Sequence, residues 1–291
     1  MARGLDHVVH VVRDLEAAGE LYDLLGFTVG SRNRHPWGTH NRIVQMPGFF
    51  MELLEVADPK AIPEPTETTF SFGAFNRDYV ATAGAGLSML VLEGRDPAAE
   101  KAEFDAAGFG GYDLFDFQRI GRLPDGSDVE VAFSLAFARD PASPHAGFFT
   151  CRQKFPENFW SPDMQRHMNG TVGVGGVVFV ADDPAAHVPF LATFAGIDFR
   201  RAIEGWHIGQ TPRGAIEVMT RELFAERFGA APAADAGLRL AAVRFAVKNI
   251  ETARKRLSSS RMAAEEIEGL IVVGPKSALG ATLVFEPAET A

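Results

Sequence analysis

The sequence predicts an α+β fold in which four β-α-β-β-β modules pair into two domains. The chain has 291 residues, which is about twice the usual length of one domain and favours two domains or a duplicated unit. A helix-capping residue is followed by a glycine, or by a residue at the equivalent place, after 12, 12, 13 and 12 positions at four points in the chain. Each of these segments follows an apolar, strand-like run, and four such matches indicate duplication.

The first module shows the pattern most clearly. Residues 5–12 form a β-rich apolar run, and Asp14 is a suitable N-cap for the helix that follows. Apolar residues recur at helical spacing from Leu15 to Leu25, and Gly26 is expected to end the helix. Three further strands are expected at 27–32, 41–45 and 49–56.

The other three modules repeat this order. Their first strands are expected at 87–92, 177–181 and 242–247, with helix caps at Asp96, Asp183 and Asn249. The later strands are expected at 112–121, 129–137 and 146–152 in the second module, at 199–204, 207–210 and 215–220 in the third, and at 264–267, 270–273 and 281–285 in the fourth.

Two stretches outside the modules set the expected domain boundaries. Residues 57–83 carry three early prolines and are expected to form a loop, and residues 156–171 are expected to connect the halves. The N-terminal domain is expected at 1–155, with modules 4–56 and 86–153, and the C-terminal domain at 172–291, with modules 172–221 and 238–288. The single helix of a module covers one face of its sheet, so modules must pair to bury the other face.

Charge and cysteine content exclude several function classes. The net charge is −10, and the basic residues form no run, which disfavours binding to nucleic acid or to an anionic membrane. Cys151 is the only cysteine, so neither a disulfide framework nor a cysteine-rich zinc cluster is possible within the chain. The N-terminal residues lack the apolar core of a signal peptide, and we expect a soluble, cytoplasmic protein.

The opening run LDHVVHVVRDLEAAGELYDLLGFTV, the later strand FFMELLEV and the run from His35 to Asn41 (HPWGTHN) carry a family resemblance. They resemble the vicinal oxygen chelate superfamily, and specifically its glyoxalase-like branch, which is related to glyoxalase I, bleomycin-resistance proteins and extradiol dioxygenases. The resemblance implies cup-shaped mixed sheets, a small-molecule substrate or ligand, a divalent metal (Zn, Fe, Mn or Ni) and the possibility of a homodimer. It places the metal ligands at His7 and Glu52.

The residues themselves allow the same metal. A carboxylate among the apolar neighbours of Glu52 is costly unless it is paired or metal-bound, and imidazole with carboxylate suits these cations. A buried hydrogen bond between the two side chains, or a solvated strand end, is the plainer interpretation. A mononuclear site needs a third ligand, for which Gln153 is the first candidate and His40 and His145 are the others.

The remaining modules lack this pair. Aligned on the helix caps, Met89, Gly176 and Ala242 take the place of His7. A residue near Cys151, then Glu217 and Leu283, take the place of Glu52. The N-terminal half is therefore expected to hold the site, and the C-terminal half to be degenerate.

We expect substrate contacts from residues near this pair, namely His40, Arg42, Phe50, Phe117, Arg166 and His167. The chain has 24 Phe, and those of the N-terminal half either line an apolar pocket or pack a core beneath the second helix.

Three functions stay open. The first is a metal-dependent lyase or isomerase with Glu52 as a catalytic residue, which fits better than ring cleavage of the dioxygenase type because the C-terminal half lacks ligands. The second is a module that binds or sequesters a small molecule without turnover, as bleomycin-resistance proteins do. The third is a partner-binding protein with no such site.

Overall fold

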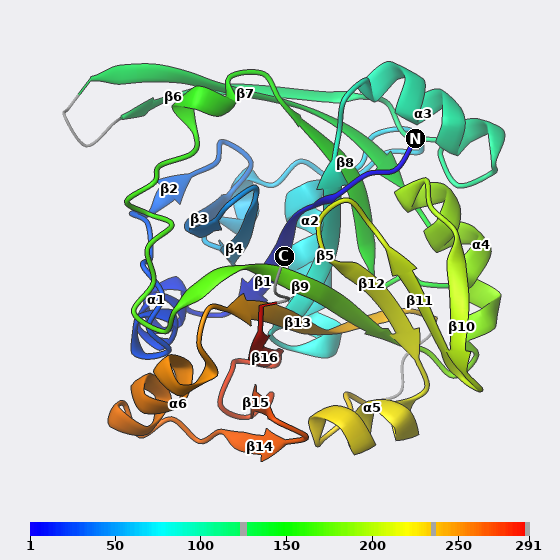
Figure 1. Cartoon of the computed structure of the whole chain (residues 1–291). Helices are drawn as coiled ribbons and strands as arrows, with labels where there is room; N and C mark the ends of the chain where they lie inside the picture. Colours follow the sequence, from blue (N-terminus) through cyan, green and yellow to red (C-terminus); the bar gives the residue numbers. More distant parts are fainter. Residues whose placement is uncertain (123–126, 234–236, 289–291) are drawn as a thin grey trace.

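The computed structural model describes residues 1–122, 127–233 and 237–288. Within them lie two eight-stranded mixed sheets (Figure 1). In spatial order the first sheet comprises β2 (Asn33–Arg34), β3 (Thr39–Met46), β4 (Phe49–Val56), β1 (Leu5–Val12), β5 (Gly86–Glu93), β8 (Gly147–Gln153), β7 (Asp128–Ala138) and β6 (Phe115–Arg122). The second comprises β10 (Phe199–Ile203), β11 (Trp206–Gln210), β12 (Ala215–Met219), β9 (Thr171–Val180), β13 (Arg239–Val247), β16 (Thr282–Pro287), β15 (Leu270–Val273) and β14 (Glu265–Ile267).

Both sheets follow the same plan. The first and last strands of each module run parallel, as β1 does with β4 and β9 with β12. The two modules of a sheet join through their antiparallel first strands, β1 with β5 and β9 with β13. The predicted α+β fold of four paired β-α-β-β-β modules is thereby confirmed.

The four module helices begin where the sequence predicts. They are α1 (Leu15–Leu24), α3 (Pro97–Ala106), α4 (Pro184–Ala195) and α6 (Ile250–Ser259). In each, the predicted cap side chain accepts hydrogen bonds from backbone N–H groups of the first turn, which otherwise lack partners.

Two helices lie outside the predicted plan, α2 (Phe72–Ala83) and α5 (Arg221–Phe228). Helix α2 occupies a stretch that was expected to be a loop. The three prolines on which that expectation rested all precede the helix, in the segment that includes the short 3₁₀ helix η1 (Pro59–Ala61), and so they do not interrupt it. A second 3₁₀ helix, η2 (Pro156–Asn158), follows the first sheet. No helix in the described ranges is long and apolar enough to cross a membrane.

One predicted strand is wrong. Residues 27–32 were expected to be extended and paired, but the structure places the short β2 later, at Asn33–Arg34. The ring of Phe27 instead turns into the core, with its centroid 4.9 Å from that of Phe245. The apolar pattern of this stretch therefore reflects burial of a connecting segment and not strand pairing.

The helix-covered faces of the two sheets share one hydrophobic core. Phe148 of β8 packs against Phe179 of β9 and against Phe190 and Phe194 of α4, at centroid distances of 4.7 to 5.7 Å. In Figure 1, α1 lies beside α6 and α3 beside α4, and Phe104 meets Phe194 across the second pair. The opposite faces carry separate apolar clusters, to which α2 and α5 respectively contribute.

Candidate functional site

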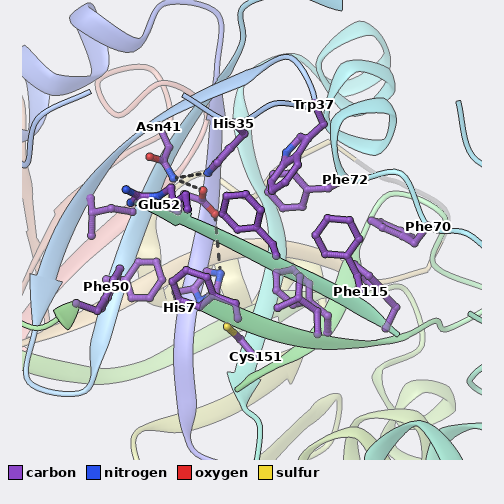
Figure 2. Close-up of a pocket in the computed structure, with 18 residues that line it drawn as sticks. His7, His35, Trp37, Asn41, Phe50, Glu52, Phe70, Phe72, Phe115 and Cys151 are labelled. Atoms are coloured by element: carbon purple, nitrogen blue, oxygen red, sulfur yellow. Dashed lines mark hydrogen bonds and ion pairs between the residues drawn. The ribbon is translucent and has the colours of Figure 1, made fainter. Parts of the chain in front are cut away.

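The concave face of the first sheet holds an apolar cavity (Figure 2). Nine phenylalanines line it, namely Phe50, Phe70, Phe72, Phe115, Phe117, Phe133, Phe137, Phe149 and Phe159. Its few ionisable or hydrogen-bonding side chains include His7, His35, Asn41, Glu52 and Arg119. Figure 2 shows His35, Asn41 and Glu52 together, with Phe70 and Phe115 away from them. An apolar pocket with a few polar groups is the usual composition of a ligand site.

His7 is held by its own neighbour in the chain. The pairing of β1 with β5 advances two residues on β1, from Leu5 to His7, against one residue on β5, so that Asp6 is the extra residue of a β-bulge. As a result, Oδ1 of Asp6 lies 2.5 Å from Nδ1 of His7, with both residues buried. The imidazole also stacks on Phe50, at a centroid distance of 4.2 Å.

The bulge corrects the expected face of one residue. Regular alternation would place Leu5 on the same face as His7, yet Leu5 and Val8 both belong to the shared core beneath the sheet. Strict alternation cannot place residues three apart on one face. The extra residue at Asp6 explains why Leu5 and Val8 nevertheless share one.

Glu52 faces the other side of the imidazole. Its Oε2 lies 3.9 Å from Nε2 of His7, which is too far for a hydrogen bond. Its Oε1 accepts a hydrogen bond of 2.5 Å from Nδ2 of Asn41. Burial raises the pKa of Glu52, and the nearby His7, Asn41 and Arg119 oppose this increase only in part. The cavity therefore favours the protonated acid more than water does.

The HPWGTHN run folds around the same end of the cavity. His35 Nδ1 lies 2.9 Å from Oγ1 of Thr39, and its Nε2 lies 3.4 Å from Nδ2 of Asn41. Burial lowers the pKa of His35 to about 3, with smaller contributions from Arg119 and His40. His35 is therefore neutral, and its ring stacks on Trp37 at a centroid distance of 4.7 Å.

The residues of the cavity do not complete a metal site. Asp6 orients His7 as carboxylates commonly orient metal-binding histidines, but a mononuclear site needs a third protein ligand. Among the described residues, no three His, Cys, Asp or Glu side chains come together as a metal-binding group. The guanidinium of Arg119 also acts on Glu52 electrostatically, and a nearby positive charge disfavours a second cation.

The expected third ligand lies elsewhere. Nε2 of Gln153 is 3.4 Å from Oδ2 of Asp6, so its amide contacts the residue behind His7 and does not line the cavity. His145 does not line the cavity either. His40 lies on the opposite face of β3, with Nδ1 3.5 Å from Oε1 of Glu55.

Of the six residues expected to contact substrate, Phe50 and Phe117 line the cavity and four lie outside it. His40 lies on the opposite side of the sheet, as described above. Arg42 pairs with Glu16 on the surface. Arg166 is exposed and pairs with Asp163. His167 ties the connecting segment to the first half, because it accepts from the backbone N–H of Thr28 and donates to the carbonyl oxygen of Gln45.

In the second sheet, ion pairs occupy the place that corresponds to the His7 and Glu52 site of the first sheet. Arg244 lies 3.0 Å from Glu217 and 2.7 Å from Glu286. Leu283 was expected to take the place of Glu52 in the fourth module, but it belongs to the shared core. The register pairs Arg244 with Val284, which places Val284, and not Leu283, on the face that corresponds to that of Glu52. The alignment on the helix caps was therefore off by one residue in the fourth module.

The sequence interpretation missed four polar residues at the site, namely Asp6, His35, Asn41 and Arg119. Strand alternation could have found two of them. Asn41 lies two residues before Ile43, which pairs with Glu52, and Arg119 lies two residues after Phe117 in a predicted strand. Asp6 could not be found this way, because the bulge places it out of phase.

Comparison with known proteins agrees with this architecture. The family model of the glyoxalase-like domain matches residues 5–194. The chain belongs to this family, and the predicted membership in the vicinal oxygen chelate superfamily is confirmed. Members of the superfamily bind small molecules. No curated protein matches the sequence.

Solved structures share the fold at low sequence identity. A hypothetical protein from Staphylococcus aureus is 12% identical with a TM-score of 0.64, covering 98% of this chain and 99% of its own. A mutant of 4-hydroxymandelate synthase from Streptomyces coelicolor is 10% identical with a TM-score of 0.60, covering 100% and 94%. A xylose isomerase-like TIM barrel/4-hydroxyphenylpyruvate dioxygenase fusion protein is 11% identical with a TM-score of 0.57, covering 100% and 50%.

Proposed function

We propose that this chain is a glyoxalase-like enzyme of the lyase or isomerase type. It binds a small organic substrate with an aromatic or otherwise apolar part, and His7 and Glu52 transfer a proton on that substrate. The observation that carries the proposal is the position of His7, with Nδ1 2.5 Å from Asp6 and Nε2 facing Glu52 across 3.9 Å at the polar part of the cavity.

The two side chains suit opposite roles. Because the carboxylate of Asp6 accepts a hydrogen bond from Nδ1, we assign the proton to Nδ1 and the free lone pair to Nε2. His7 is then the base that takes a proton from a carbon next to a carbonyl group. Glu52, which burial favours in its protonated form, donates its proton to the carbonyl oxygen. The product is an enol, with His7 protonated and Glu52 ionised. When His7 returns its proton to a neighbouring carbon and Glu52 takes back the proton of the enol hydroxyl, the carbonyl group forms again and the isomerisation is complete.

This assignment departs from the metal-dependent chemistry that the resemblance implies. In the proposed step His7 is the base and Glu52 the acid, so neither is held as a metal ligand. The incomplete ligand set and the charge of Arg119 support this choice.

Exchange of carbon-bound protons with solvent tests the proposal directly. Small aryl ketones, beginning with phenylacetone, are incubated with the protein in deuterated water, and loss of the proton signal next to the carbonyl is followed by NMR. The wild type should exchange these protons faster than buffer alone. His7→Gln and Glu52→Gln should each slow the exchange roughly 100-fold or more, the usual contribution of a general acid or base.

A matched control separates catalysis from overall charge. Glu67→Gln removes a carboxylate from an exposed loop and should exchange the ketones at the wild-type rate. Exchange no faster than buffer across the ketones, or full activity in His7→Gln, would contradict the proposal.

Binding without turnover is the second candidate. The nine phenylalanines around so few polar groups favour it, because such a cavity holds an apolar molecule whether or not it reacts. Saturable binding of aryl ketones without proton exchange above the buffer rate would select this function.

A further inference from the structure

Arg119 enters the cavity from the strand that forms the edge of the first sheet. It follows Phe115 and Phe117 at alternate positions of β6, so the three side chains share the face toward the cavity, and all three line it. Its neighbours across the strand pair, Val131 and Phe133, are apolar.

The guanidinium group has no close partner among the described residues. It forms no hydrogen bond and no ion pair within 4.0 Å to any residue of the described ranges, although it is half-buried. Burial accordingly disfavours its charged form, and the more distant Glu52 compensates only in part. A cation in such surroundings is costly until an anion or a set of acceptors reaches it.

A second donor in the cavity wall is also unmatched. The indole N–H of Trp37 is buried and donates to no described residue. Trp37 contacts Phe117, two residues from Arg119, at a ring-centroid distance of 4.6 Å. The wall thus carries an excess of hydrogen-bond donors, and a ligand that satisfies them must bring acceptor oxygens.

We propose that the cavity selects an organic anion, namely an aromatic or aryl-alkyl molecule with one carboxylate, and that Arg119 binds that carboxylate while the phenylalanines hold the ring. This specifies the substrate class of the proposed enzyme and rests on that proposal for the choice of cavity. A planar guanidinium matches a carboxylate through two parallel hydrogen bonds, which also fixes the orientation of the ligand. The carboxylate then lies on the same side of the cavity as the proton-transfer pair.

The test compares two ligands of nearly equal shape, the anion 3-phenylpropanoate and the neutral 3-phenylpropanamide. Their dissociation constants are measured by titration calorimetry on the full chain at pH 7. The wild type should bind the anion roughly tenfold more tightly or better, since a hydrogen bond to a charged group commonly contributes that much.

Arg119→Met should remove this preference and leave binding of the amide within about twofold of the wild type. Arg119→Lys should retain part of it, because the charge remains while the paired geometry is lost. Arg201→Met, which removes an exposed arginine of the second sheet that pairs with Glu204, is the matched control and should bind both ligands as the wild type does.

The possible outcomes either support or overturn the preference of the cavity for an anion. Equal affinities for anion and amide in the wild type, or equal weakening of both by Arg119→Met, would overturn the anion preference and leave the apolar cavity and its proton transfer standing. Failure of both ligands to bind also overturns it. Loss of proton exchange in the aryl ketone experiment with the anion preference intact would instead reject the proposed enzyme alone.

Discussion

Asp6 and His7 are adjacent in the chain, yet their side chains meet at a distance of 2.5 Å between Oδ1 and Nδ1. In a regular strand neighbouring side chains point to opposite faces, and the bulge in β1 removes that constraint. Asp6 is therefore a positioning residue for His7, and the rest of the site is arranged around the nitrogen that this contact leaves free.

Asp6→Asn should slow proton exchange roughly 10- to 100-fold and leave binding of 3-phenylpropanoate unchanged. The amide has the size of the carboxylate but loses its charge, and it can donate to Nδ1, which would move the proton of His7 to the wrong nitrogen. The measurement is the ketone exchange rate beside the dissociation constant. A parallel loss of ligand affinity would show that Asp6 supports the cavity instead of orienting His7.

The stability of Glu52→Gln relative to the wild type should increase as the pH rises. The folded-state pKa of Glu52 is raised above its unfolded value, mainly by burial, so its contribution to stability is complete below about pH 4.5 and is lost as the pH rises through the folded pKa. The loss is roughly 1.4 kcal/mol for each unit of increase in the pKa. Thermal unfolding at pH 4.5 and pH 8 should show the difference from wild type growing with pH, with Glu67→Gln as a control that shows no such trend.

Removal of metal should leave both proton exchange and ligand binding unchanged. Dialysis against EDTA is expected to change neither the ketone exchange rate nor the affinity for 3-phenylpropanoate, because the described residues complete no metal-binding group. Elemental analysis before dialysis should give well below one equivalent of divalent metal, and His7→Gln should not lower it. A stoichiometric metal whose removal abolishes exchange, and whose return restores it, would contradict this expectation.

The repeated elements of this fold could be read from the sequence because each has a local cause. Asp14 and Asn249 cap helices through their own side chains, and the apolar alternation around them follows the strand geometry. The site could be predicted only in part. His7 and Glu52 were identified as a pair, whereas Arg119 comes from a different module and reaches them only through the joining of β1 with β5.

Register explains the residues that were misplaced. His40 and Arg42 are close to Glu52 along the chain of the first module, but β3 pairs Ile43 with Glu52, so the even-numbered residues of β3 point to the helix-covered side. A one-residue shift moves every side chain of a strand to the other face. Sequence position alone therefore identifies the neighbourhood of a site more reliably than the side from which each residue approaches it.

Phe148→Ala should destabilise the whole chain by about 3 to 5 kcal/mol, the usual cost of removing a buried phenylalanine. Its ring lies on the first sheet and packs against Phe179 and Phe190 of the second half. Because the two sheets share this core, calorimetry should show one unfolding transition in the wild type and a single transition at lower temperature in the variant. Two separate transitions would mean that the halves unfold independently.

Asp140→Asn should weaken the same junction in a pH-dependent way. His187 of α4 lies 2.6 Å from the carboxylate of Asp140, which precedes β8, and Ser143 also donates to it. Burial alone would raise the pKa of Asp140, but these hydrogen bonds and that of the Ala142 N–H hold it below its usual value. The carboxylate therefore contributes stability above its unfolded pKa of about 3.9, and this contribution is lost as the pH falls through the lower folded value.

Urea unfolding of Asp140→Asn should give a loss of about 2 kcal/mol at pH 7 and at pH 5, and this loss should shrink below pH 4. The exposed Asp163→Asn should show no loss at any pH. A difference that stays constant below pH 4 would mean that Asp140 acts through packing and not through its charge.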